Sequence, residues 1–345
     1  MGNNALALNI VTFMVNRKLG SFMVSARTIA TEIGFCLGVL NHEDFSTSPN
    51  IIEMESSHWE QFVNSQNRYN NLVNLSFRQG QEVARNIGLI ESVEWVANSH
   101  LRYGSQIDVV INGNLPISLK HDSAILYNPG PDLLFARNLN DNLAKTNSLW
   151  KQRVAPNEYQ DFYYQARHTT RLLELPQNVS NITSEQGLRL RRAMPARQWP
   201  SDYVLLPYYQ SLTTAVAIES SRIWSMNNSN EQQRTNLFLR IFRFLDNQNY
   251  RFVGRCGEEF LLNVISSSEW RRRYRVINFR SFRRPSVQAE VGWEFTILDI
   301  SNGEEITISG HVQVRWSHGK NFYNNCESKV YLDSNHSEIP GYDSI

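Results

Sequence analysis

Two stretches of strict alternation near the C-terminus constrain the fold more than any other feature of this chain. Apolar side chains alternate with mostly polar ones over residues 287–297, and the pattern resumes over residues 306–316 after Asn302-Gly303. Such alternation is typical of a half-buried strand, and Asn-Gly between two strands indicates a tight turn. The sequence therefore predicts a long antiparallel hairpin with one face in a core.

Earlier segments mix helical and strand patterns. Over residues 59–87 the apolar side chains recur at spacings of three, four and seven, which predicts helical structure, and Gly80 indicates a break within it. Strand-like runs follow at 93–97, 107–111 and 115–120. Helical spacing returns around 212–226 and 237–245, with Met226 on the apolar face of the first. We therefore expect an α+β fold.

Charge and cysteine content limit the partners and the compartment. The 345 residues carry a formal net charge of +1, so an anionic partner requires a local basic patch. Six of the 34 basic residues are lysines and 28 are arginines, an excess that suits bidentate contacts with phosphates and base edges, although codon usage accounts for it equally well. Three cysteines without a CxxC pair favour a reducing cytoplasm. The apolar stretch 5–15 is too short to span a membrane.

Arginines gather between residues 240 and 284. This segment holds eleven arginines and four acidic residues, with aromatic side chains interleaved. Because aromatic rings can stack while guanidinium groups reach phosphates or base edges, we interpret the segment as a DNA-binding surface. A solvated, salt-bridged face is the alternative. The arginines expected to contact DNA are Arg271, Arg272, Arg273, Arg275, Arg280, Arg283 and Arg284.

A shorter predicted hairpin carries residues that suit catalysis. Asp108 lies on its first strand, while Ser118 and Lys120 share a face of its second strand because side chains alternate. A two-residue turn would point Asp108 away from Lys120. A three-residue turn over 112–114 sets Asp108 opposite Ser118 and brings all three side chains together. A catalytic role for these residues therefore requires the longer turn.

A carboxylate beside a lysine suits metal-assisted phosphodiester hydrolysis. The carboxylate can hold Mg²⁺, and the lysine can orient or deprotonate the attacking water. One carboxylate is thin ligation for Mg²⁺, so a second acid is expected nearby; Glu82 in the preceding helix is the first choice, with Glu91 and Glu94 as alternatives. A purely structural role, in which Asp108 caps a turn and Lys120 is solvated, also fits the pattern.

A helix followed by three strands, with Asp108 on the second strand and Lys120 on the third, resembles the PD-(D/E)XK nuclease superfamily. The resemblance covers roughly residues 58–125. It implies a Mg²⁺ site formed by Asp108, Glu82 and the backbone carbonyl of Leu119. The implied catalytic residues are Asp108, Lys120, Glu82 and Ser118. Ser118 departs from the family pattern, which has Glu or Asp there, so metal binding would depend more strongly on Glu82.

Two short runs are similar to HaeIII-type restriction endonucleases. These are Ile117-Ser118-Leu119-Lys120-His121 and, more faintly, Arg315-Trp316-Ser317-His318-Gly319-Lys320. The resemblance implies a PD-(D/E)XK-like nuclease core with a large helical and β-hairpin addition for DNA recognition. The corresponding division is an N-terminal helical segment at 1–57, a nuclease core at 58–150, and a DNA-recognition and dimerisation region at 151–345.

The activity that this resemblance implies is that of a Mg²⁺-dependent type II restriction endonuclease in the bacterial cytoplasm. Such an enzyme hydrolyses phosphodiester bonds in double-stranded DNA at a short specific sequence. A two-fold homodimer matches a palindromic site, and a cognate DNA methyltransferase is expected in the host. Two alternatives stay open: a repair or structure-specific nuclease, and a non-catalytic DNA-binding protein with a degenerate site.

Overall fold

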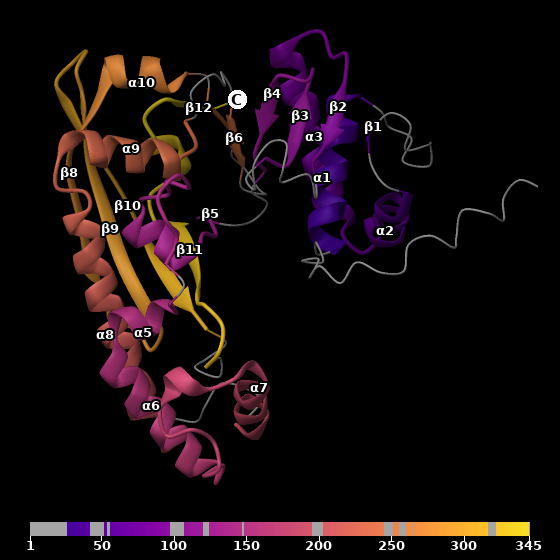
Figure 1. Cartoon of the computed structure of the whole chain (residues 1–345). Coiled ribbons are helices and arrows are strands. Elements are labelled where there is room, and N and C mark those ends of the chain that lie inside the picture. Colours follow the sequence, from indigo (N-terminus) through magenta and orange to yellow (C-terminus); the bar gives the residue numbers. More distant parts are fainter. Residues whose placement is uncertain are drawn as a thin grey trace, which may run out of the picture.

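Helices and largely antiparallel sheets form two bodies that lie side by side in this computed structural model (Figure 1). The structure describes residues 26–41, 52–53, 56–96, 107–119, 124–146, 148–194, 203–244, 251–254, 260–263, 265–316 and 322–344. The expected α+β class is therefore confirmed. Within those residues, no helix combines the length and apolar character needed to cross a lipid bilayer.

The smaller body contains three helices and a four-stranded sheet. Its helices are α1 (Ala26–Val39), α2 (Ser56–Gln66) and α3 (Asn70–Ile87). Its strands are β1 (Ile52–Glu53), β2 (Val93–Trp95), β3 (Val109–Ile111) and β4 (Leu115–Ile117), in the spatial order β1-β2-β3-β4. The expected succession of helix and three strands is present as α3, β2, β3 and β4, with neighbouring strands antiparallel.

Gly80 is not a helix break, contrary to the sequence-based expectation. The helical segment is interrupted near residues 67–69, and α3 runs unbroken through Gly80. A Cβ atom at Gly80 would collide with the carbonyl oxygen of Phe35, and one at Gly38 would collide with the backbone of Phe77. These glycines therefore let α1 and α3 pack with their backbones in close contact, a reason that local sequence does not reveal.

The larger body is built on a five-stranded antiparallel sheet in the order β5-β11-β10-β9-β8. Its strands are β5 (Ile125–Tyr127), β8 (Tyr274–Arg283), β9 (Ala289–Asp299), β10 (Glu304–Arg315) and β11 (Glu327–Leu332). A three-stranded sheet, β12-β7-β6, comprises β6 (Arg251–Gly254), β7 (Phe260–Asn263) and β12 (Tyr342–Ser344).

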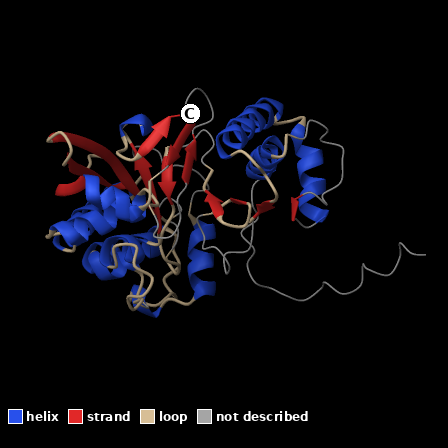
Figure 2. Cartoon of the chain, turned by 90° about the horizontal axis from the view of Figure 1, so that it is seen from above, coloured by secondary structure: helices blue, strands red, loops and turns tan. Residues whose placement is uncertain are grey.

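The larger body also contains several helices, most of which lie on one side of its strands (Figure 2). They are the π-helix η2 (Asp132–Ala136), α5 (Trp150–Val154), α6 (Pro156–Thr169), α7 (Ser184–Ala193), α8 (Leu206–Met226), α9 (Glu231–Ile241) and α10 (Ser267–Arg273), with short 3₁₀ turns η3 (Val179–Asn181) and η4 (His336–Glu338). Both α8 and α9 contact β8, which makes these helices the cover of the sheet's apolar face.

The long hairpin predicted near the C-terminus is confirmed. Strands β9 and β10 pair without a register shift, and Gly303 in the turn has φ +76°. Trp293 and Phe295 of β9 are fully buried in the main core. The helices expected around 212–226 and 237–245 correspond to α8 and α9, although α9 begins earlier and ends at Ile241. Met226, the last residue of α8, is 60% exposed rather than buried on an apolar face.

The two largest hydrophobic cores do not follow the boundaries that the sequence predicted. The core of the smaller body includes residues from α1, α2, α3 and the three strands that follow, so α1 is not a separate N-terminal segment ending at residue 57. The core of the larger body includes Leu126 of β5 and Trp150 of α5. The second core therefore begins with β5 rather than at residue 151.

Lys151 lies on α5 inside the larger core and is 1% exposed. Its Nζ lies 3.5 Å from the carbonyl oxygen of Asn324 and 5.2 Å from the ring centroid of Tyr159. Burial lowers the pKa of Lys151 to about 8, and the nearby Cys326 opposes this shift. The buried ammonium therefore destabilises the native state at neutral pH.

We expect Lys151→Met to raise the free energy of unfolding at pH 7 by about 2 kcal/mol, because removing the desolvation penalty outweighs the lost hydrogen bond. In the parent chain, the unfolded state holds its proton to about pH 10.5 while native Lys151 loses it near pH 8, so stability should rise with pH between these values. Urea unfolding at pH 7 and pH 9 measures both effects. A methionine variant less stable than the parent at pH 7 would contradict this account.

Candidate active site

The turn between β3 and β4 has the length that a catalytic role requires. Residues 112–114 form it, with Ile111 paired to Leu115. Asn112 and Gly113 have φ of +51° and +67°, values that Asn and Gly tolerate best. The Asn112 side chain also accepts a hydrogen bond from the Glu91 backbone N–H at 2.7 Å, which anchors the turn to the loop before β2.

Asp108 and Ser118 meet at the other end of this hairpin. The pairing of Val109 with Ile117 continues to set Asp108 opposite Ser118. Asp108 Oδ2 accepts the backbone N–H of Leu119 at 2.6 Å and the Ser118 hydroxyl at 3.4 Å. These two donors fix the orientation of the carboxylate. Lys120, the next residue, lies outside the described residues, so its expected place beside Asp108 stays a prediction.

Arg243 joins this hairpin to the larger body. It follows the C-terminal end of α9, is 4% exposed, and donates a hydrogen bond to Ser118 Oγ from one guanidinium nitrogen and to the Leu126 carbonyl at 2.7 Å from another. Burial lowers the pKa of Arg243, and the charge of Asp108 is the largest effect opposing that shift. Ser118 itself is completely buried, so its hydroxyl links Asp108 to a buried cation.

The sequence does not single out Arg243 from the other arginines of its segment. Its φ is +61°, a left-handed conformation that usually favours glycine at the end of a helix. A non-glycine residue held there by side-chain contacts is a signal of a specific role, but it is visible only in the folded structure.

No contact between Glu82 and Asp108 is found among the described residues. Among the described contacts, the Glu82 carboxylate pairs with Arg85, one turn along α3. The C-terminal end of α3 leads to the loop that Asn112 anchors, at the turn end of the hairpin. Asp108 lies at the opposite end of β3. The arrangement therefore does not support the sequence-based choice of Glu82 as the second metal ligand.

Glu94 is the better placed of the other two acids. It pairs with Val110 across β2 and β3, so it shares a sheet face with Asp108, two residues from Val110. Such diagonal neighbours lie about 7–8 Å apart, within reach of long side chains. Glu94 is half-buried, whereas Glu91 is exposed and lies at the turn end.

The donor set on this face fits Mg²⁺. Mg²⁺ is commonly held by one or two carboxylates, with phosphate and water oxygens completing the octahedron. Asp108 and Glu94 supply two carboxylates on one face, and the backbone of Leu119 lies against Asp108. In the part of the chain that the structure describes, no three His, Cys, Asp or Glu side chains converge. Asp108 and Glu94 could therefore hold an ion only if substrate and water supplied most of its other ligands.

Part of the arginine segment is neutralised by acids that lie later in the sequence. Three ion pairs connect it to such acids: Arg273 with Asp299 at 3.0 Å, Arg280 with Glu294 at 2.8 Å, and Arg284 with Asp333 at 2.5 Å. Arg272 lies 4.0 Å from Glu269. Among the described residues, no carboxylate lies within ion-pairing distance of Arg271, Arg275 or Arg283, and DNA contacts by these arginines stay a prediction.

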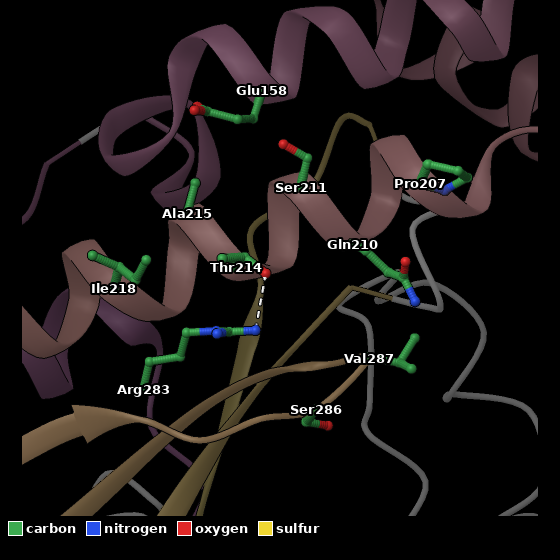
Figure 3. Close-up of a pocket in the computed structure, with 10 residues that line it drawn as sticks. All are labelled: Glu158, Pro207, Gln210, Ser211, Thr214, Ala215, Ile218, Arg283, Ser286 and Val287. Atoms are coloured by element: carbon green, nitrogen blue, oxygen red, sulfur yellow. Dashed lines mark hydrogen bonds between the residues drawn. The ribbon is translucent and has the colours of Figure 1, made fainter.

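A pocket of about 590 Å³ lies between α6, α8 and the turn after β8 (Figure 3). Arg283 lines it and donates a hydrogen bond to Thr214 at 3.3 Å. Glu158 and the half-exposed side chains of Ile218 and Val287 also line this pocket. Arg283 thus faces a surface of mixed character rather than a purely basic one.

The residues of the candidate site come from two bodies and from segments that are 125 positions apart. Comparison with protein-family models, with curated proteins and with solved structures finds no match to this chain.

Proposed function

We propose that this chain is a Mg²⁺-dependent endonuclease of double-stranded DNA, of the type II restriction class. The observation that carries the proposal is the meeting of Asp108 and Ser118 on one face of a strand hairpin, across the three-residue turn that such a site requires. Strand alternation in the sequence predicts the same face for Lys120. Carboxylate and lysine together suit hydrolysis of a phosphodiester.

The proposed residues divide the work at the phosphate. Asp108 and Glu94 would hold Mg²⁺, with the Leu119 carbonyl as a further oxygen ligand. When bound, the ion supplies charge neutralisation at the phosphate and an acidified water. Lys120 orients the attacking water. Ser118 positions the Asp108 carboxylate through its hydroxyl group, which explains how a serine can stand where related nucleases have an acid.

The larger body is proposed to surround and read the duplex. Its size exceeds what hydrolysis alone requires, and the side chains of Arg271, Arg272 and Arg275 are exposed. A homodimer would match a palindromic site through its own two-fold symmetry. A methyltransferase of the same specificity would protect the host DNA.

Incubating the purified chain with a mapped plasmid and Mg²⁺ tests the proposed activity. Discrete fragments that disappear when EDTA removes the metal support a restriction endonuclease. Nicking or smearing without discrete fragments would favour a repair or structure-specific nuclease instead. Retained DNA binding without any cleavage would favour a degenerate site, and would refute the proposed hydrolysis.

The choice between two acids gives a sharper test of the metal site. Glu94→Gln should lower the rate of Mg²⁺-dependent cleavage at least about tenfold, as loss of a metal ligand or its support does. The matched control Glu82→Gln, with the same change at a partly exposed position of α3, should stay within about twofold of the parent. Initial cleavage rates over a Mg²⁺ titration give both values. A larger loss of rate in Glu82→Gln than in Glu94→Gln would indicate that Glu82 of α3 is the second metal ligand.

A further inference from the structure

A second pocket, of about 260 Å³, lies where the end of α8, the face of α9 and the loop after η2 come together. Three of its lining residues, Gln233, Asn236 and Arg240, lie on α9 at spacings of three and four and therefore share one face of the helix. Asn140 and Asn227 line it from the loop and from the end of α8. The pocket is therefore lined mainly by carboxamides and guanidinium groups.

Hydrogen bonds determine which way most of these carboxamides are turned. Asn236 Oδ1 accepts from the Arg271 guanidinium at 2.6 Å, and Asn140 Oδ1 accepts from the backbone N–H of Asn142 at 3.2 Å. Guanidinium and backbone N–H groups can only donate, so the bonded atoms must be oxygens. The NH₂ groups of Asn236 and Asn140 are consequently the groups with which these side chains can donate hydrogen bonds to a ligand.

Gln233 follows the same rule, whereas Asn138 and Asn227 do not. Asn138, which also lines the pocket, donates its NH₂ to the Asn227 carbonyl and to Asn228 Oδ1. Gln233 Oε1 accepts from the backbone N–H of Asn230 in the capping box of α9, which again leaves an NH₂ group. Asn227 instead donates its NH₂ to the carbonyls of Phe135 and Ala136. Donors thus outnumber acceptors on the side chains that line the pocket.

The cationic groups at this pocket are held in place. Arg240 donates from Nη1 to the Asn138 carbonyl at 2.9 Å, which fixes the guanidinium plane. The positive charge of Arg271 and the negative charge of Asp141 both act on Arg240, in opposite directions. Arg137, which also lines the pocket, is neutralised by Asp132 at 3.0 Å. The net charge of the ionisable groups around the pocket is therefore positive.

We propose that this pocket binds a phosphate group. Phosphate oxygens carry negative charge and only accept hydrogen bonds, which matches walls rich in donors and a surplus of positive charge. A base edge presents donors as well as acceptors, so it matches such walls less well. The volume lies below the range of about 300–1,000 Å³ typical of pockets for drug-sized molecules, and suits one phosphate group.

The position of the pocket points to a phosphate of the DNA backbone, an assignment that rests on the proposed function. Arg240 lies in the last turn of α9, three residues before Arg243, and Arg243 contacts Ser118 beside Asp108. A backbone phosphate bound here would lie near the proposed cleavage site and would hold the duplex in register.

Two nearly isosteric substitutions test the pocket without removing local structure. Asn236→Asp keeps the oxygen that accepts from Arg271, and Gln233→Glu keeps the capping box, in which glutamate is a favoured residue. Each replaces a neutral donor by a carboxylate. Gln232→Glu adds the same charge on the same helix at an exposed residue that does not line the pocket, and is the matched control.

Duplex DNA binding is measured in Ca²⁺ over a range of salt concentrations. Asn236→Asp and Gln233→Glu should each weaken binding about tenfold and reduce the slope of log K against log salt by about 0.9, the value for one phosphate. Gln232→Glu should stay within about twofold of the parent. Affinities of the two pocket variants that equal the control value would overturn the assignment of a DNA phosphate.

Inorganic phosphate distinguishes the possible sources of the ligand. It is added to the parent chain and to the Asn236→Asp variant at constant ionic strength, with chloride as reference, and the melting temperature is recorded. Suppose that the parent chain does not bind DNA, and that phosphate raises the melting temperature of the parent but not of the variant. The pocket is then a site for free phosphate, and the proposed nuclease function is refuted. If phosphate raises the melting temperature of neither protein and the Asn236→Asp substitution does not change DNA affinity, the proposal that this pocket binds phosphate is refuted.

Discussion

Replacing Lys120 by alanine is expected to lower the rate of Mg²⁺-dependent DNA cleavage at least about a hundredfold, while DNA affinity in Ca²⁺ stays close to that of the parent chain. A lysine that orients the attacking water and stabilises developing charge acts mainly in the transition state. A hundredfold loss corresponds to about 3 kcal/mol in the barrier. Lys120 directly follows Leu119, whose backbone N–H binds the Asp108 carboxylate.

A second lysine provides the control for this measurement. Lys329 is half-buried on β11, in the larger body, so Lys329→Ala removes the same side chain from a strand outside the candidate site. It should cleave DNA at a rate within about twofold of the parent. Single-turnover rates in Mg²⁺ and binding in Ca²⁺ separate chemistry from affinity. If Lys120→Ala cleaves DNA at the parent rate, the proposal that this hairpin carries a nuclease active site is refuted.

Replacing Arg243 by alanine should lower the free energy of unfolding by about 3–5 kcal/mol, the usual effect of removing one partner from a buried charged contact. The substitution removes the hydrogen bonds that Arg243 donates to Ser118 Oγ and to the Leu126 carbonyl, and it removes a buried positive charge that interacts with Asp108. Urea denaturation of the parent and the variant at the same pH measures the difference.

Glycine at the same position tests how much of this effect comes from the side chain. Arg243 has φ +61°, and glycine adopts that conformation without the penalty of about 1 kcal/mol that other residues carry. Arg243→Gly should therefore be more stable than Arg243→Ala by about 1 kcal/mol, while still well below the parent. An alanine variant within 1 kcal/mol of the parent would show that Arg243 does not hold the two bodies together.

Local elements of this protein are determined by the sequence alone. The β9–β10 hairpin follows from alternation on both sides of Asn302-Gly303, and the turn over 112–114 contains residues that tolerate positive φ. Strand period and turn conformation depend on residues within a few positions of one another, so they can be predicted without knowledge of the rest of the chain. The sequence left the register open between a two-residue and a three-residue turn, and the structure contains the three-residue turn that sets Asp108 opposite Ser118.

Contacts between distant segments are decided only by the tertiary structure. Gly80 lies in an unbroken helix because α1, more than 40 residues earlier, packs against it. Glu94 shares a sheet face with Asp108 because strand pairing, not proximity in sequence, puts residues on one face. Ser118 meets Arg243 across 125 positions. Such contacts depend on how the two cores are packed, and local periodicity carries no information about that packing.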